Sequence, residues 1–165
     1  MTSSYQLAQL NIARLKAPLD SPELKDFVDN LDRINELADN SPGFIWRLTG
    51  DGNDATALRP MGDDVIVNMS VWRDVESLKN YVYRSPHVEI LKRKREWFTR
   101  MAESPFVLWW VAAGHQPTLA EAANKLILLR ERGPSPAAFT FVSAFAAPDA
   151  AQANAPFSFR DTCPA

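Results

Sequence analysis

This sequence has few of the features that mark secreted, membrane or disulfide-bonded proteins. Its 165 residues include a single cysteine, Cys163, which cannot form an internal disulfide or a metal cluster. No apolar run approaches the roughly 20 residues that a membrane span needs. The N-terminal segment lacks the basic and long apolar regions of a signal peptide. We therefore expect a cytoplasmic protein without a membrane partner.

Excess charge and common catalytic motifs are also missing. The formal net charge is −2, so no general attraction to nucleic acid is expected. The basic run Lys92–Arg95 would point around most of a helix and is diluted by nearby glutamates, which is typical of a solvated helix face. The sequence contains no phosphate-binding glycine loop, nucleophile elbow, CxxC or paired-carboxylate motif. Five tryptophans, nine phenylalanines and three tyrosines remain as the better clue to function.

What the sequence does contain is an alternation of strand and helix patterns. The predicted strands are residues 5–12, 44–49, 65–72 and 106–112, with a short fifth strand allowed at 139–145. The predicted helices start at Pro22, after Asp74 and at the capping box of Thr118 and Glu121. The second of these is interrupted at Ser85-Pro86-His87 and resumes as one helix that ends in Trp97-Phe98.

The order of these elements predicts an α+β fold. Strand-helix-strand, twice over, is the ferredoxin-like split βαβ sandwich, a mostly antiparallel sheet with helices on one face. On the third strand Val65, Val67, Met69 and Val71 form a wholly apolar face that needs cover. A second copy of the chain is the usual cover, so we expect a homodimer, the dimeric α/β barrel. Residues 1–145 are predicted to form one domain, followed by a poorly structured tail, 146–165, from which Phe157 and Phe159 could dock.

The segment VNMSVWRDVESLKNYVYRSPHVEIL, a strand ending in Trp followed by a helix and a Ser-x-His step, resembles the antibiotic-biosynthesis-monooxygenase superfamily of dimeric α/β barrels. Over roughly residues 5–145 the chain is similar to a bacterial branch of that superfamily that is a domain of unknown function. Related branches include cofactor-free oxygenases of polycyclic phenols, haem-degrading enzymes, and haem-containing monooxygenases and dehydratases. The resemblance implies a monooxygenase-like oxidoreductase without a cofactor, or alternatively one with haem.

The haem-degrading relatives have an Asn near the position of Asn11, where it hydrogen-bonds the ligand. They also carry a helical Trp and a His iron ligand, whose positions correspond here to Tyr81 and Leu91. Both residues differ, which argues against haem degradation of that type.

His87 is the predicted catalytic base, because an imidazole can accept and return a proton near neutral pH. Arg84 and Asn11 are the other predicted catalytic residues, and Asn11, Asn68 or Arg84 would stabilise the developing oxyanion. The alternative is that His87 only caps a helix or packs at an interface. His115 is interpreted as a surface turn residue, although either histidine could bind haem as an axial ligand.

The aromatic residues predict a binding site for a flat hydrophobic molecule between sheet and helices. Trp46 is expected on the face opposite Arg47, together with Phe44, and some tryptophans are expected in the core. The predicted substrate-binding residues are Tyr83, Asn68, Trp72, Trp46, Trp97 and Trp109. Three functions remain open: cofactor-independent oxygenation, a haem protein, and a small-molecule binding module without catalysis.

Overall fold

A computed structural model describes residues 3–149 of the chain. The strands are β1 (Tyr5–Leu15), β2 (Phe44–Arg47), β3 (Val65–Trp72), β4 (Phe98–Thr99) and β5 (Phe106–Ala112). The α-helices are α1 (Lys25–Asp39), α2 (Val75–Arg84), α3 (His87–Lys92), α4 (Lys94–Trp97) and α5 (Leu119–Arg132), and a 3₁₀ turn, η1 (Pro22–Leu24), precedes α1.

The sheet is antiparallel, and β1 lies at its centre. β3 pairs with one edge of β1, and β2 pairs with the far edge of β3. β5 and the two-residue β4 pair with different parts of the other edge of β1. The resulting order β5-β1-β3-β2 is the ferredoxin-like order, and it confirms the predicted α+β fold.

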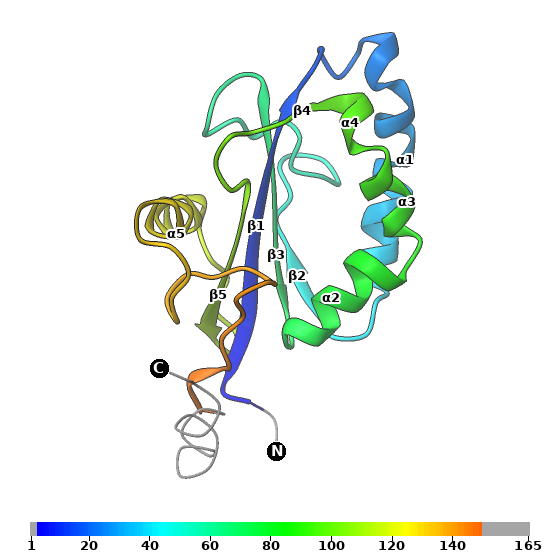
Figure 1. The fold of residues 1–165 in the computed structure, drawn as a ribbon. Coiled ribbons are helices and arrows are strands. Elements are labelled where there is room, and N and C mark those ends of the chain that lie inside the picture. Colours follow the sequence, from blue (N-terminus) through cyan, green and yellow to red (C-terminus); the bar gives the residue numbers. More distant parts are fainter. Residues whose placement is uncertain (1–2, 150–165) are drawn as a thin grey trace.

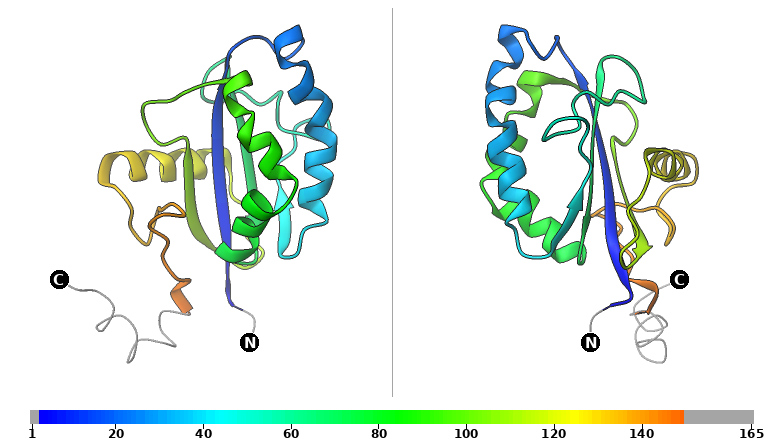
Figure 2. Two further views of the ribbon diagram at one scale, coloured as in Figure 1. Left: turned by 45° about the vertical axis from the view of Figure 1, so that its right-hand side comes forward. Right: turned by 180° about the vertical axis from the view of Figure 1, so that it is seen from behind.

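The helices form a layer on each side of the sheet. Helices α1 to α4 lie on one face, and α5 lies alone on the other (Figure 1; Figure 2 shows both faces). The α5 side chains Ala122, Leu126 and Leu129 belong to one buried cluster with the apolar face of β3. On β3 itself, Val65 and Met69 are 2% and 1% exposed in the single chain.

This arrangement corrects the physical argument for a dimer. The apolar face that was expected to require a second subunit is covered by α5 and by the loop that carries Ala55, Leu58 and Met61. Homodimerisation therefore stays a prediction of the family resemblance, and a dimer would use a different surface unless α5 moved away.

Three local predictions were wrong in detail. A register shift between Phe44 and Trp46 puts these two side chains on opposite faces of the sheet, where simple alternation had placed them together. Residues 139–145 form no strand; only a bridge between Leu108 and Phe139 is present. The second half of the interrupted helix is itself divided at Arg93 into α3 and α4.

The predicted cap of α5 is half correct. Thr118 Oγ1 accepts a hydrogen bond from the Glu121 main-chain N–H at 3.1 Å. The Glu121 side chain, however, does not return to the main chain of Thr118. Its two oxygens accept from the indole N–H of Trp109 at 3.0 Å and contact Nε2 of His115 at 2.8 Å. Glu121 thus holds α5 against β5 and the turn that follows it.

The C-terminal part of the described chain is attached to the N-terminal part. Asp149 accepts hydrogen bonds from the main-chain N–H of Ser4 at 2.7 Å and from the hydroxyl of Ser3 at 2.9 Å. Most of the predicted tail, including Phe157 and Phe159, lies outside the described residues, as does Cys163.

Candidate functional site

The side of the sheet that faces α1–α4 (the helix-facing side) carries two separate apolar clusters with polar residues between them. One cluster contains Leu7, Trp72 and Leu108, and the other contains Ile66 and Trp97. The residues between the clusters are Gln9, Asn11, Asn68 and Ser70, which occupy two register pairs of the central strands. The middle of this face is therefore polar.

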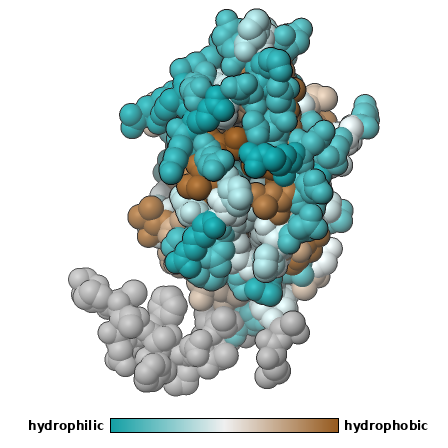
Figure 3. All heavy atoms as spheres, turned by 90° about the vertical axis from the view of Figure 1, so that its right-hand side faces the viewer, coloured by the Kyte–Doolittle hydropathy of each residue, from teal (hydrophilic) through white to brown (hydrophobic). Residues whose placement is uncertain are grey.

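Asn11 and Asn68 lie directly opposite each other in the register of β1 and β3. Both side chains are exposed although they point toward the helices from the two central strands. Above them, the inward stripe of α1 is only half-buried at Phe27, Leu31 and Ile34. Solvent therefore reaches the two asparagines between the apolar clusters. Figure 3 shows apolar atoms near the middle of the helical face with polar side chains around them.

These two asparagines also have free hydrogen-bonding groups. Among residues 3–149, no partner contacts the side chain of Asn11 or the Nδ2 of Asn68. The Oδ1 of Asn68 accepts from Gln9 Nε2 at 2.7 Å. An exposed amide with free hydrogen-bonding groups is available to a ligand.

Gln9 and Ser70 connect Asn68 to a buried tryptophan. Gln9 is 4% exposed, and its Nε2 also donates to Ser70 Oγ at 2.8 Å. Ser70 Oγ accepts a second hydrogen bond, from Trp72 Nε1 at 2.8 Å. Gln9 and Ser70 were not among the predicted site residues, because their significance comes from the pairing of two distant strands.

An aromatic stack continues from Trp72 to His87. The Trp72 ring stacks on Tyr81 with centroids 5.1 Å apart, and the Tyr81 ring lies 4.8 Å from that of His87. The Tyr81 hydroxyl donates to the main-chain oxygen of Ile34 on α1 at 3.2 Å. Burial raises the pKa of Tyr81 well above its ordinary value, so the phenol stays neutral.

His87 is held with one nitrogen bound and the other free. Its Nδ1 lies 3.2 Å from the main-chain oxygen of Val82, which can only accept, so a neutral imidazole carries its proton on Nδ1. Burial lowers the pKa of His87, and the contact with Val82 offsets part of this effect. Within the described chain, Nε2 has no hydrogen-bond partner and is available as a base.

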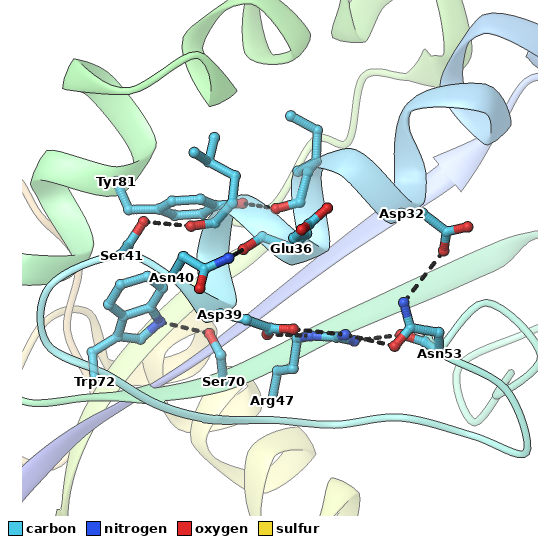
Figure 4. A network of polar contacts seen from close by, with 12 residues as sticks. Asp32, Glu36, Asp39, Asn40, Ser41, Arg47, Asn53, Ser70, Trp72 and Tyr81 are labelled. Carbon is cyan, nitrogen blue, oxygen red and sulfur yellow. Dashed lines mark hydrogen bonds and ion pairs between the residues drawn. The ribbon is translucent and has the colours of Figure 1, made fainter.

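Arg47 links β2 to the end of α1 and to the loop that carries Asn53 (Figure 4). Its side chain is 10% exposed, and its Nε lies 2.7 Å from Asp39 at the end of α1. The guanidinium also donates to the side-chain oxygen of Asn53 at 2.9 Å, and Asn53 reaches Asp32 on α1 at 3.3 Å. Arg47 does lie on the face opposite Trp46, as strand alternation predicts, but no role could be predicted for it because its partners come from a helix and a loop.

Most of the chain matches the model of one protein family. A family model described as "Domain of unknown function (DUF3291)" matches residues 6–155. The chain belongs to the DUF3291 family. This confirms the predicted relation to a domain of unknown function, and no curated protein matches the chain.

Solved structures similar to this DUF3291 chain include SnoaB, a cofactor-independent oxygenase from Streptomyces nogalater, with 16% identity, a TM-score of 0.44 and coverage of 70% of this chain and 98% of that one. A conserved protein from Methanosarcina mazei has 15% identity, a TM-score of 0.46 and coverage of 67% and 95%. A protein from Chloroflexus aurantiacus, described as a putative antibiotic biosynthesis monooxygenase, has 16% identity, a TM-score of 0.41 and coverage of 69% and 98%. Likeness at this level does not extend to activity.

The structure brings only part of the predicted site together. Asn11, Asn68 and Trp72 share the helix-facing side of the sheet, and His87 is joined to them through Tyr81. Trp97, 1% exposed, lies in the other apolar cluster of that side.

The remaining predicted residues of the DUF3291 chain lie elsewhere. The Arg84 side chain is 76% exposed and pairs with Glu76 at 4.0 Å, and Tyr83 is exposed beside Phe141. Trp46 and Trp109 pack into the cluster on the α5 face. Their strands place them on the far side of the sheet from Asn68, so one cavity cannot contain all the predicted residues.

The donor groups of the described chain limit the choice of metal or cofactor. No cluster of three or more His, Cys, Asp or Glu side chains suited to a metal ion occurs among the described residues. His115 is a poor haem ligand because its Nε2 already contacts Glu121. The free Nε2 of His87 is chemically suited to an axial position. No helix in residues 3–149 has the length and apolar character needed to cross a membrane.

Proposed function

We propose that this DUF3291 protein binds a flat hydrophobic molecule with an oxygen substituent in the space between the sheet and α1–α3. The observation that carries the proposal is the pair Asn11 and Asn68, two amides with free groups lying between two apolar clusters. Apolar walls with a few convergent polar groups suit such a ligand, because the walls supply burial and the amides orient the oxygen.

The reaction proposed for this site is cofactor-independent oxygenation, as in the oxygenases that the sequence resembles. His87 Nε2 would remove a proton from an activated C–H or O–H group of the substrate. The resulting carbanion reduces O₂ and forms a C–O bond to a peroxide. Loss of water from the protonated peroxide then leaves a carbonyl, so one oxygen atom enters the product and the other leaves as water.

In this scheme Asn11 and Asn68 stabilise the negative oxygen of the deprotonated substrate. They replace Arg84 in that role, because its guanidinium is 76% exposed and pairs with Glu76 at 4.0 Å. The buried surroundings of His87 favour its neutral form, which is the form a base requires.

Oxygen uptake with 9-anthrone, a flat tricyclic ketone with an acidic C–H, tests this function. The wild-type protein is expected to accelerate uptake above the protein-free rate. Asn68→Ala should lower kcat by about 10- to 100-fold, and His87→Ala by about 100-fold or more. Arg84→Ala is the matched control and should keep the wild-type rate. If uptake and binding are unchanged in both His87→Ala and Asn68→Ala, the site is wrongly placed.

Haem binding is the alternative that the same histidine allows, because a ring N–H bound to a carbonyl is typical of ligating histidines. Titration with haemin separates the two functions. The cofactor-free proposal predicts no stoichiometric Soret shift. A shift that is lost in His87→Ala but kept in His115→Ala would replace the proposal by a haem function.

A further inference from the structure

The hydrogen-bond partners of the buried Gln9 side chain indicate which end of its amide is the nitrogen and which is the oxygen. Its Nε2 donates to Asn68 Oδ1 at 2.7 Å and to Ser70 Oγ at 2.8 Å. The same nitrogen faces the main-chain oxygen of Asn68 at 3.5 Å. If the amide were turned over, its oxygen would face that carbonyl oxygen, and two acceptors would oppose each other.

The partner on the other side of Ser70 is consistent with this direction. The indole Nε1 of Trp72 is a donor only, so Ser70 Oγ must accept from it, and one lone pair remains for Gln9. Both Gln9 and Trp72 are almost completely buried, at 4% and 1% exposure. Water therefore cannot readily replace these partners.

We propose that Gln9 is a positioning residue that sets the hydrogen-bonding polarity of the candidate site. By donating to Oδ1 of Asn68, Gln9 leaves the Nδ2 of that exposed amide free, so the site offers a donor there. The preferred ligand consequently presents an acceptor to Asn68, a carbonyl or phenolate oxygen rather than an O–H or N–H group. Asn11, which has no partner among residues 3–149, can rotate its amide either way and does not set this polarity.

This inference rests on the proposed ligand site, but its first test needs no ligand. Solvent exchange of the side-chain amide protons is measured by NMR on the wild-type protein. We expect slow exchange for the Gln9 amide and fast exchange for that of Asn68. The opposite order, or equally fast exchange of both amides, would overturn the proposal whatever the protein binds.

A second test uses three tricyclic molecules of nearly equal shape, with affinities measured by equilibrium dialysis. 9-Fluorenone carries only an acceptor, carbazole carries an N–H donor, and fluorene carries neither. The wild-type protein should bind 9-fluorenone about tenfold more tightly than carbazole, because the wrong polarity leaves a buried polar group unpaired.

Variants at Gln9 separate positioning from general stability. Gln9→Glu replaces the donor by an acceptor, so the Asn68 amide should turn over and the preference should reverse toward carbazole. Gln9→Met removes the hydrogen bond that orients Asn68. The variant should bind 9-fluorenone and carbazole with about equal affinities, and its affinity for fluorene should be unchanged. Gln6→Glu makes the same change on the same strand, where the side chain accepts from the main chain of Gly114, and should leave the preference unaltered.

The outcomes distinguish the two proposals. Equal affinities for all three molecules in the wild type and variants would keep the hydrophobic site and overturn the polarity. If none of the three molecules binds, the flat-ligand function fails, and the exchange measurement alone then decides whether Gln9 orients Asn68.

Discussion

The imidazole of His87 packs on the phenol ring of Tyr81, with ring centroids 4.8 Å apart and ring planes inclined by 43°. Tyr81 is in turn stacked on Trp72, so the proposed base belongs to an aromatic assembly and is partly buried. Its protonation is therefore linked to folding, which leads to the first prediction.

We predict that His87 titrates below the ordinary histidine pKa of about 6.5. Because burial lowers its pKa in the folded state, the unfolded chain takes up the proton first as the pH falls. The stabilising contribution is thus fully present above the unfolded pKa and is lost as the pH falls through the folded pKa. NMR titration of the ring protons measures the shift, and urea unfolding between pH 8 and pH 5 measures the slope.

A His87→Gln variant is the control for this prediction. It should flatten the fall in unfolding free energy at acid pH, because the proton-binding difference at residue 87 is removed. An unchanged slope would mean that other groups cause the acid sensitivity.

We predict that Arg47 stabilises the fold through its shared contacts with Asp39 and Asn53. Arg47→Lys loses the two-nitrogen contact with Asp39 and should lower the unfolding free energy by about 1–3 kcal/mol. It should also speed hydrogen exchange around Asn53. Arg14→Lys is the matched control, since the pair Arg14–Asp64 is 51% and 61% exposed and should contribute less than about 1 kcal/mol.

Neighbouring residues on α5 test whether this helix covers the apolar sheet face. Leu126 is 2% exposed and Ile127 is 49% exposed. Leu126→Ala should lower the unfolding free energy by about 2–4 kcal/mol, whereas Ile127→Ala should change it by less than about 1 kcal/mol. Equal effects in chemical denaturation would contradict the packing of α5 on β5 and β1.

Two glycines with similar backbone angles separate steric overlap from backbone strain. Gly43 and Gly114 have φ of 85° and 87°. A Cβ on Gly43 would overlap Ser77 and lie 2.5 Å from its Cβ, whereas one on Gly114 would meet nothing within 4 Å. Gly114→Ala should cost about 1–2 kcal/mol from backbone strain. Gly43→Ala should cost about 1–3 kcal/mol more, because it also overpacks the turn between α1 and β2. Thermal unfolding of both variants measures the difference.

Several site residues were predictable because local pattern decides their direction. Strand alternation put Asn11 with Leu7 and Gln9, and it put Asn68 with Ser70 and Trp72. The register of β1 and β3 brings these two rows together as neighbours. By contrast, the tryptophan set was divided, because a bulge in β2 turned Trp46 to the face opposite Phe44 and alternation placed Trp109 on the α5 side.

The sequence by itself determined the order of the elements, the bounds of β3 and β5, the break before His87 and the apolar face of β3. These features follow from the period of the hydrophobic pattern and from proline and capping residues, which act within a few residues of the chain. Only the tertiary structure decided that α5 and the loop that carries Ala55 cover that apolar face, that Gln9 donates to Asn68, and that Arg84 is exposed beside Glu76. Each of these depends on which distant segments of the chain contact each other, and a local sequence pattern does not specify such contacts.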